Sequence, residues 1–149
     1  MSEERKKQAE ELLDTWKDTE KELTNLQKNA ALEIQILEAN GKLNHEQAVK
    51  AKLQLDVDMA KKTVDVAKQM FAEMATAREA DMKKIQASMA TLSEEDKKKA
   101  QEKLDILTEE QEKARAIIEE SEAKLAAAHT AQLQLYINET KEANDAIVA

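Results

Sequence analysis

The chain has 149 residues, of which 36% are charged, 42% hydrophobic and only 2% aromatic, and it contains one glycine, no proline and no cysteine. This composition is typical of long helices, and it excludes a disulfide framework and a thiolate metal site. The net charge of −8 repels phosphate backbones, so nucleic acid is not an expected partner.

The first segment predicts one long helix from about residue 3 to residue 39. Ser2 and Glu3 suit a helix start, because a hydroxyl can cap the backbone and the helix dipole favours carboxylates there. Apolar residues then recur mostly at steps of three and four, as on one face of a helix. They are Ala9, Leu12, Trp16, Leu23, Leu26, Ala30, Ile34 and Leu37.

Gly41 predicts the first reversal of the chain, since glycine reaches the left-handed conformation that ends many helices without steric cost. Asn44 and Gln47 form a capping box that restarts a helix three residues later. The connection is so short that the two flanking helices are expected to lie antiparallel.

A second helix is predicted over about residues 45–90 and a third over 94–147. Ser93, followed by three acidic residues, repeats the start signal and marks a second reversal. Thr108 begins another capping box, which leaves a kink or break as an alternative. We favour one unbroken third helix, because the apolar face continues through this point without a change of phase.

Two reversals and three helices predict an all-α fold, an elongated antiparallel three-helix bundle or coiled coil of unequal helices, in one domain over residues 1–149. When the chain is folded back at its two predicted turns, the rings of Trp16 and Phe71 come to the same level along the bundle. The small side chains of Ala67 and Ala114 leave room for these rings. The predicted core layer consists of Leu13, Trp16, Ala67, Phe71, Ala114 and Ile117. The same reflection places Tyr136 near Ala48. A closed monomer and a dimer of hairpins would use the same apolar stripes, and both stay open.

Five of the six methionines lie in the second predicted helix. Methionine fills irregular gaps in a core, and it is also common on surfaces that adapt to several partners. The second interpretation predicts that these side chains are exposed in the isolated chain. The candidate interaction surface consists of Met59, Met70, Met74, Met82 and Met89.

No pattern of catalytic chemistry is found. His45 and His129 lack the spacing that would put two metal ligands on one helical face. The acidic clusters around Glu110 and Glu120 have no glycine loop or nucleophile beside them, which is typical of a solvated helix face. We therefore predict neither an enzyme nor a cofactor or metal site.

The first residues are highly charged and include no apolar core of a signal peptide, and no run approaches the roughly 18 apolar residues of a membrane span. A soluble protein of the cytoplasm or a virion interior is expected, with membrane insertion not expected.

Residues 31–43 and 47–56 read ALEIQILEANGKL and QAVKAKLQLD. These stretches, and residues 98–120 in a similar style, resemble the coiled-coil helical hairpins of tailed-phage tail tape measure proteins. The resemblance implies a structural role inside a tail tube, with contacts to tube or initiator proteins and no catalysis. Tape measure proteins are far longer and usually include apolar segments that this chain lacks. Phage scaffolding proteins are a related comparison. Several of them have a basic coat-binding terminus, which residues 141–149 of this chain do not match.

The sequence therefore favours a non-enzymatic structural or assembly protein that acts through coiled-coil contacts with protein partners or with itself. One alternative is an amphipathic bundle that opens onto lipid or granule surfaces, suggested by the Ala-rich face at residues 125–131. Another is a small acidic inhibitor or adaptor, whose association would depend strongly on salt.

Overall fold

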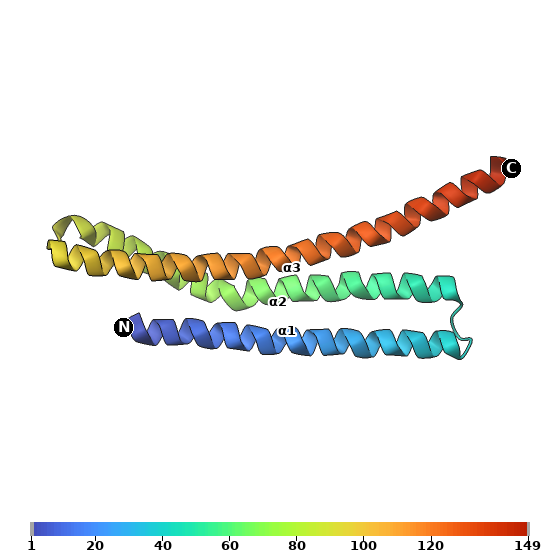
Figure 1. Ribbon diagram of the computed structural model, residues 1–149, viewed down its shortest axis with the longest axis horizontal. Helices are drawn as coiled ribbons and strands as arrows, with labels where there is room; N and C mark the ends of the chain where they lie inside the picture. Colours follow the sequence, from blue (N-terminus) through green and yellow to red (C-terminus); the bar gives the residue numbers. More distant parts are fainter. Residues whose placement is uncertain (1, 149) are drawn as a thin grey trace. The chain divides into compact units, whose positions relative to one another are not determined.

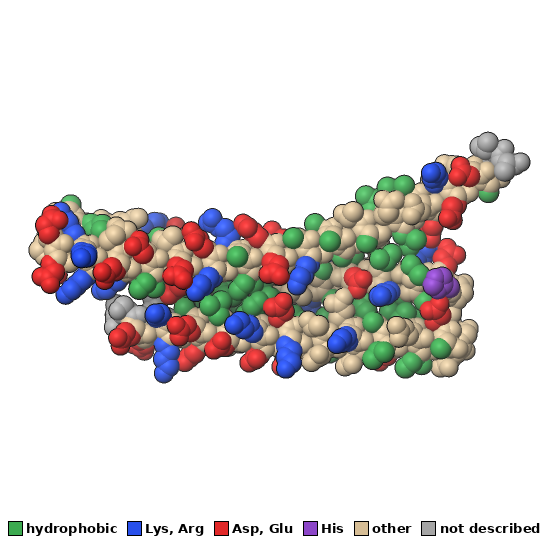
Figure 2. All heavy atoms as spheres, in the orientation of Figure 1, with side chains coloured by type: hydrophobic (Ala, Val, Ile, Leu, Met, Phe, Trp, Pro, Cys, Tyr) green, Lys and Arg blue, Asp and Glu red, His purple; other side chains and the backbone are tan. Residues whose placement is uncertain are grey.

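The computed structural model describes residues 2–148, and helices make up nearly all of this part of the chain (Figure 1). Helix α1 spans Ser2–Ala39, α2 spans His45–Ser88 and α3 spans Glu94–Val148, and a short 3-10 turn, η1, covers Met89–Thr91. In the view of Figure 2, charged side chains are spread over α1 and over the first half of α3. The described residues contain no β-strand, so the predicted all-α fold is confirmed.

The helix boundaries lie close to the predicted ones. The second helix was predicted to reach residue 90, whereas α2 ends at Ser88 and the chain tightens into η1. Helix α3 is continuous, so the alternative break near Thr108 does not occur. The Thr108 hydroxyl donates a hydrogen bond of 2.8 Å to the carbonyl oxygen of Leu104, which is the behaviour of a threonine inside a helix rather than of a cap.

The described residues group into two compact units, and each unit takes segments from all three helices. The first unit contains residues 2–19 and 65–120, and the second contains residues 20–64 and 121–148. The α1–α2 connection lies in the second unit and the α2–α3 connection in the first, and each reverses the chain direction. Within residues 2–148, the chain that was predicted as one domain groups into these two compact units.

The first unit is built around an aromatic layer, and the structure brings together all six residues predicted for it. Its buried members are Trp16, Ala67, Phe71 and Ala114, and Leu13 and Ile117 pack against them. The ring centroids of Trp16 and Phe71 lie 6.2 Å apart with their planes at 57°, a tilted arrangement that aromatic pairs favour. Ala67, a small residue of the same cluster, is fully buried.

The first reversal closes as a Schellman motif around Gly41. This glycine has a φ of +75°, in the left-handed region. Its backbone N–H donates to the carbonyl oxygen of Glu38 at 3.1 Å, and that of Lys42 donates to Leu37 at 2.9 Å. These two bonds satisfy carbonyl groups that the end of α1 would otherwise leave without an intrahelical partner.

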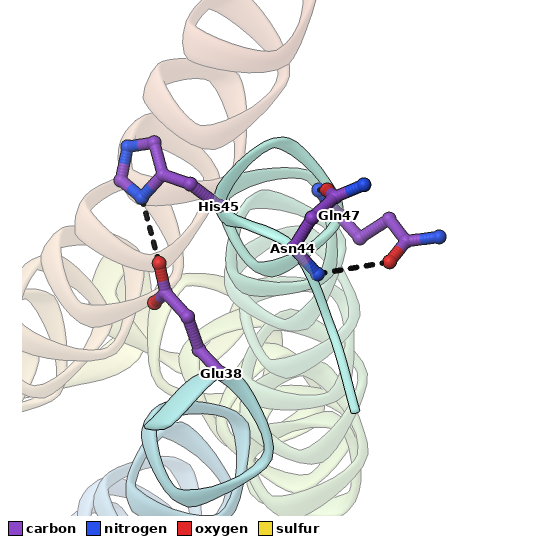
Figure 3. A network of polar contacts seen from close by, with 4 residues as sticks. All are labelled: Glu38, Asn44, His45 and Gln47. Carbon is purple, nitrogen blue, oxygen red and sulfur yellow. Dashed lines mark hydrogen bonds and ion pairs between the residues drawn. The ribbon is translucent and has the colours of Figure 1, made fainter. Parts of the chain in front are cut away.

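Helix α2 starts with the predicted capping box (Figure 3). The backbone N–H of Gln47 donates to the Asn44 side-chain oxygen at 2.8 Å, and the backbone N–H of Asn44 donates to the Gln47 side-chain oxygen at 3.0 Å. Beside the box, Nδ1 of His45 lies 2.8 Å from a carboxylate oxygen of Glu38, which ties the start of α2 to the end of α1.

The second reversal uses no glycine. The backbone of Leu92 is extended, with a φ of −87° and a ψ of 152°. The Ser93 hydroxyl then accepts a hydrogen bond of 3.3 Å from the backbone N–H of Asp96. Three acidic residues follow in the first turn of α3, where the helix dipole favours negative charge.

In the second unit, two polar contacts join α2 and α3. The side-chain amide of Gln132 donates to Gln54 at 2.8 Å, and the Lys50 ammonium lies 3.2 Å from a carboxylate oxygen of Glu139. Hydrogen bonds to Glu139 and then to Glu46 raise the pKa of Lys50 above its usual value. Tyr136, which was predicted to lie near Ala48, is 67% exposed.

Candidate interaction surface

The five methionines predicted as a candidate interaction surface are all half-buried, four of them along α2 and Met89 in η1. Met70 packs against the aromatic layer, and Met74 lines a small cavity beside it. A partner groove would require exposed methionines, and none of the five is exposed, namely Met59, Met70, Met74, Met82 and Met89. Their positions favour the packing role.

Sequence reasoning missed a buried charge pair in the first unit. Arg78 is only 5% exposed, and its Nε lies 3.9 Å from a carboxylate oxygen of Glu110, whose side chain is 12% exposed. In the sequence, Arg78 appears only as an interruption of the apolar stripe of α2. A signal was present, because Arg78 follows Phe71 by seven residues and Glu110 precedes Ala114 by four, so both charges share faces with the aromatic layer.

The cavity between this charge pair and the aromatic layer has a volume of about 20 Å³. That volume is close to what one water molecule needs. The cavity is therefore too small to hold a substrate, and the charge pair belongs to the packing of the first unit.

The two histidines lie at the surface. The His45 side chain is 84% exposed even though it contacts Glu38, and His129 is exposed on α3. Within residues 2–148, no three His, Asp or Glu side chains come together as ligands for a metal ion. Over the same residues, none of the helices combines the length and apolar character needed to cross a bilayer.

The second unit contains a groove of about 410 Å³ among its three helical segments. Among the residues that line it, the side-chain amide of Gln27 donates a hydrogen bond of 2.7 Å to a carboxylate oxygen of Asp56. The ammonium group of Lys124 lies 3.7 Å from a carboxylate oxygen of Glu20. The α3 wall is supplied largely by alanines at positions 127, 128 and 131. Such small side chains cannot fill the space between helices, and the polar groups pair with one another. The groove is thus a loosely packed junction of helices rather than a set of groups converging on a ligand.

The part of α3 that belongs to the second unit has two different faces. One stripe is half-buried in the unit and consists of Leu125, Ala128, Gln132, Leu135 and Glu139. A second stripe is rotated from it by about 140° at roughly 100° per residue. We call this stripe the outer seam. Its eight residues are all exposed, and they are Ala123, Ala126, Thr130, Leu133, Ile137, Thr140, Asn144 and Ile147.

The middle of the outer seam, from Ala126 to Ile137, lies in the least charged part of the chain, since residues 125–138 contain no Asp, Glu, Lys or Arg. Leu133 is 58% exposed, Ile137 48% and Ile147 82%. A shorter exposed stripe on α1 in the same unit includes Leu32 and Ile36. Large apolar side chains that recur along one helix face without an internal partner are typical of contact surfaces.

Neither stripe was predicted as a site, although the Ala-rich face at residues 125–131 drew attention to this part of α3. The absence of charge from residues 125–138 was the signal available in the sequence. No family model, curated protein or solved structure matches this chain.

Proposed function

We propose that this protein is a non-enzymatic structural or assembly protein that acts through helix–helix contacts with other protein chains. The observation that carries the proposal is the pair of exposed apolar stripes in the second unit. Leu32 and Ile36 repeat at four residues on α1, and Leu133 and Ile137 do so on α3. This spacing presents both side chains of a pair to one partner helix.

The resemblance to tail tape measure proteins supplies the biological setting of the proposal. In that setting, the long helices would contact tube or initiator proteins, in the cytoplasm or inside a virion. The hairpin that carries the resemblance includes the Gly41 turn and the start of α2, and it lies in the same unit as both exposed stripes.

Sedimentation velocity of the full chain over a wide range of concentrations tests the proposed function. We expect species larger than the monomer, which become smaller when the apolar stripes are made polar. Circular dichroism of each variant is the control, because a true surface substitution leaves the helix content unchanged. A chain that stays monomeric at all concentrations and binds lipid vesicles instead would contradict the proposal.

Lipid or granule binding is the second candidate, and the exposure of Tyr136 and Ile147 on α3 favours it specifically. An amphipathic helix buries such side chains at a membrane interface. Trp16 is buried in the first unit, so a bundle that opens onto lipid should change its emission. Neutral and anionic vesicles, each at neutral and acid pH, separate the two candidates, because the assembly function predicts no binding and no change in Trp16 emission.

A further inference from the structure

The first reversal combines an asparagine with the chain's single glycine, as Asn40 and Gly41. The other asparagines, at positions 25, 29, 44, 138 and 144, are each followed by a residue that has a side chain. A backbone nitrogen can attack the side-chain carbonyl carbon of the asparagine before it, and a Cβ on the attacking residue hinders the approach. Glycine has no Cβ, so its backbone can come close. The sequence therefore favours this intramolecular attack at Asn40.

The structure leaves both partners of the attack accessible. Asn40 and Gly41 are exposed just after the end of α1, and a Cβ built on Gly41 would meet no atom within 4 Å. The side-chain oxygen of Asn44 instead accepts a hydrogen bond from the backbone N–H of Gln47 at 2.8 Å. The asparagines at positions 25, 29, 138 and 144 lie inside α1 and α3, where the following backbone nitrogen is held in the helical ladder.

One hydrogen bond restrains the attacking nitrogen in the closed reversal. The Gly41 backbone N–H donates to the carbonyl oxygen of Glu38 at 3.1 Å. This bond has to open, and the backbone of Asn40 has to rotate, before the nitrogen can reach the side chain. Residues 39–42 are all exposed, and exposed helix ends open at low free-energy cost. The closed reversal therefore slows the attack, and each opening permits it.

We propose that Asn40 is a site of spontaneous covalent modification, at which opening of the first reversal lets the asparagine convert to aspartate or isoaspartate. The Gly41 nitrogen gives its proton to a base in the solvent and bonds to Cγ of Asn40, a reaction that proximity favours. The side-chain nitrogen takes up a proton and leaves as ammonia, so that a succinimide ring remains. Water then adds to one of the two ring carbonyls and breaks its bond to the Gly41 nitrogen. Attack at Cγ gives aspartate, and attack at the backbone carbonyl gives isoaspartate.

Neither product suits the end of α1. Both carry a new carboxylate where the helix dipole disfavours negative charge, and the last turn of α1 contains no basic residue. In isoaspartate the main chain also runs through Cβ, which adds one methylene before Gly41. The N–H groups of Gly41 and Lys42 are then displaced from the carbonyl oxygens that they bond in the closed reversal. The isoaspartate product thus keeps the first reversal from closing again as a Schellman motif.

Peptide mapping of the full chain after incubation at mildly alkaline pH tests the site. Trypsin releases residues 29–42, which contain both Asn29 and Asn40, so fragmentation in the mass spectrometer compares the two asparagines within one peptide. We expect the mass gain of an NH₂ group replaced by OH at Asn40, with a rate at least about tenfold higher than at Asn29. N40Q should show no gain, because glutamine must close a larger ring. Equal conversion of Asn29 and Asn40 would overturn the inference.

The same chain unfolded in guanidinium chloride gives the rate without a closed reversal. Asn40 in the folded chain should react more slowly, but within about 100-fold of that rate, because only the end of α1 has to open. A stronger suppression would show that the folded reversal prevents the reaction, and would overturn the inference.

Hydrogen exchange tests the effect of the modification on the reversal. Anion exchange separates the converted chain, which has one more negative charge, and an isoaspartate-specific methyltransferase identifies the isoaspartate form. N40D is the matched control, since it carries the same charge on a normal backbone. The amides of Gly41 and Lys42 should exchange at least about tenfold faster in the isoaspartate chain than in N40D. Equal protection of these amides in the two chains would overturn the proposed effect on the first reversal.

Discussion

Gly41 is the residue at which the backbone takes a positive φ of +75°. A Cβ at this position would meet no atom within 4 Å, so a substitution acts through the backbone alone. We expect Gly41→Ala to lower the free energy of unfolding by about 1 kcal/mol. Gly41→Asn should cost less, because asparagine enters the left-handed region more readily. Urea denaturation checks both values, and equal losses would argue against a conformational origin.

Phe71 carries much of the packing of the first unit. Phe71→Ala should lower the free energy of unfolding by about 3 kcal/mol, since it leaves a cavity beside Trp16, and should shift Trp16 emission to longer wavelength. Glu73→Ala is the matched control on the same helix, because Glu73 is exposed and should change stability by less than about 0.5 kcal/mol. Denaturation followed by Trp16 fluorescence measures both effects. Similar values for the two variants would show that the aromatic layer does not stabilise the fold.

At the scale of the helices, Ser93 and Thr108 look alike in sequence but differ in structure. Ser93→Ala removes a hydroxyl that accepts the hydrogen bond from Asp96 at the start of α3, and should cost about 1 kcal/mol of unfolding free energy. Thr108 lies within α3 and donates to Leu104, so Thr108→Ala should be neutral within about 0.5 kcal/mol. Thermal denaturation of the two variants gives the comparison. A larger loss for Thr108→Ala would indicate a helix start at residue 108.

The pairing of α2 with α3 in the first unit includes the buried charges of Arg78 and Glu110. Removing one charge takes a partner from the other in a poorly solvated place, so Arg78→Met should cost about 3 kcal/mol of unfolding free energy. R78M/E110M should cost less than R78M alone, because neither position then holds a buried charge. A double-mutant cycle in urea measures the coupling. Additive losses would show that the two charges act independently.

At the scale of the whole molecule, stability should vary along α3. Ala114 and Ser121 are buried, whereas residues 141–147 are exposed on all sides. Regions with few buried contacts open at low free-energy cost. We expect backbone amides of residues 141–147 to exchange hydrogen much faster than those of residues 114–121 in a dilute, monomeric sample. Exchange followed by NMR tests this, and equal exchange rates in the two segments would contradict it.

The elements of the fold could be predicted because their signals are local. Gly41, Asn44 and Ser93 mark helix ends through their own backbone and hydrogen-bonding preferences. The aromatic layer could be predicted as well, since two short turns leave few ways to align Trp16 with Phe71. Arg78 was missed because its burial depends on Glu110, which lies 32 positions away in the sequence and meets it only after the second reversal.

The sequence by itself determined the helices, the two reversals and the level at which the aromatic rings meet, because periodicity and capping act between residues close in the chain. Only the tertiary structure decided which apolar stripes are buried. The stripe with Leu125 and Leu135 packs within the second unit, while Leu133 and Ile137 stay exposed. The physical reason is that a helix rich in small and apolar residues can pack through more than one face, and the choice depends on neighbours brought together by folding.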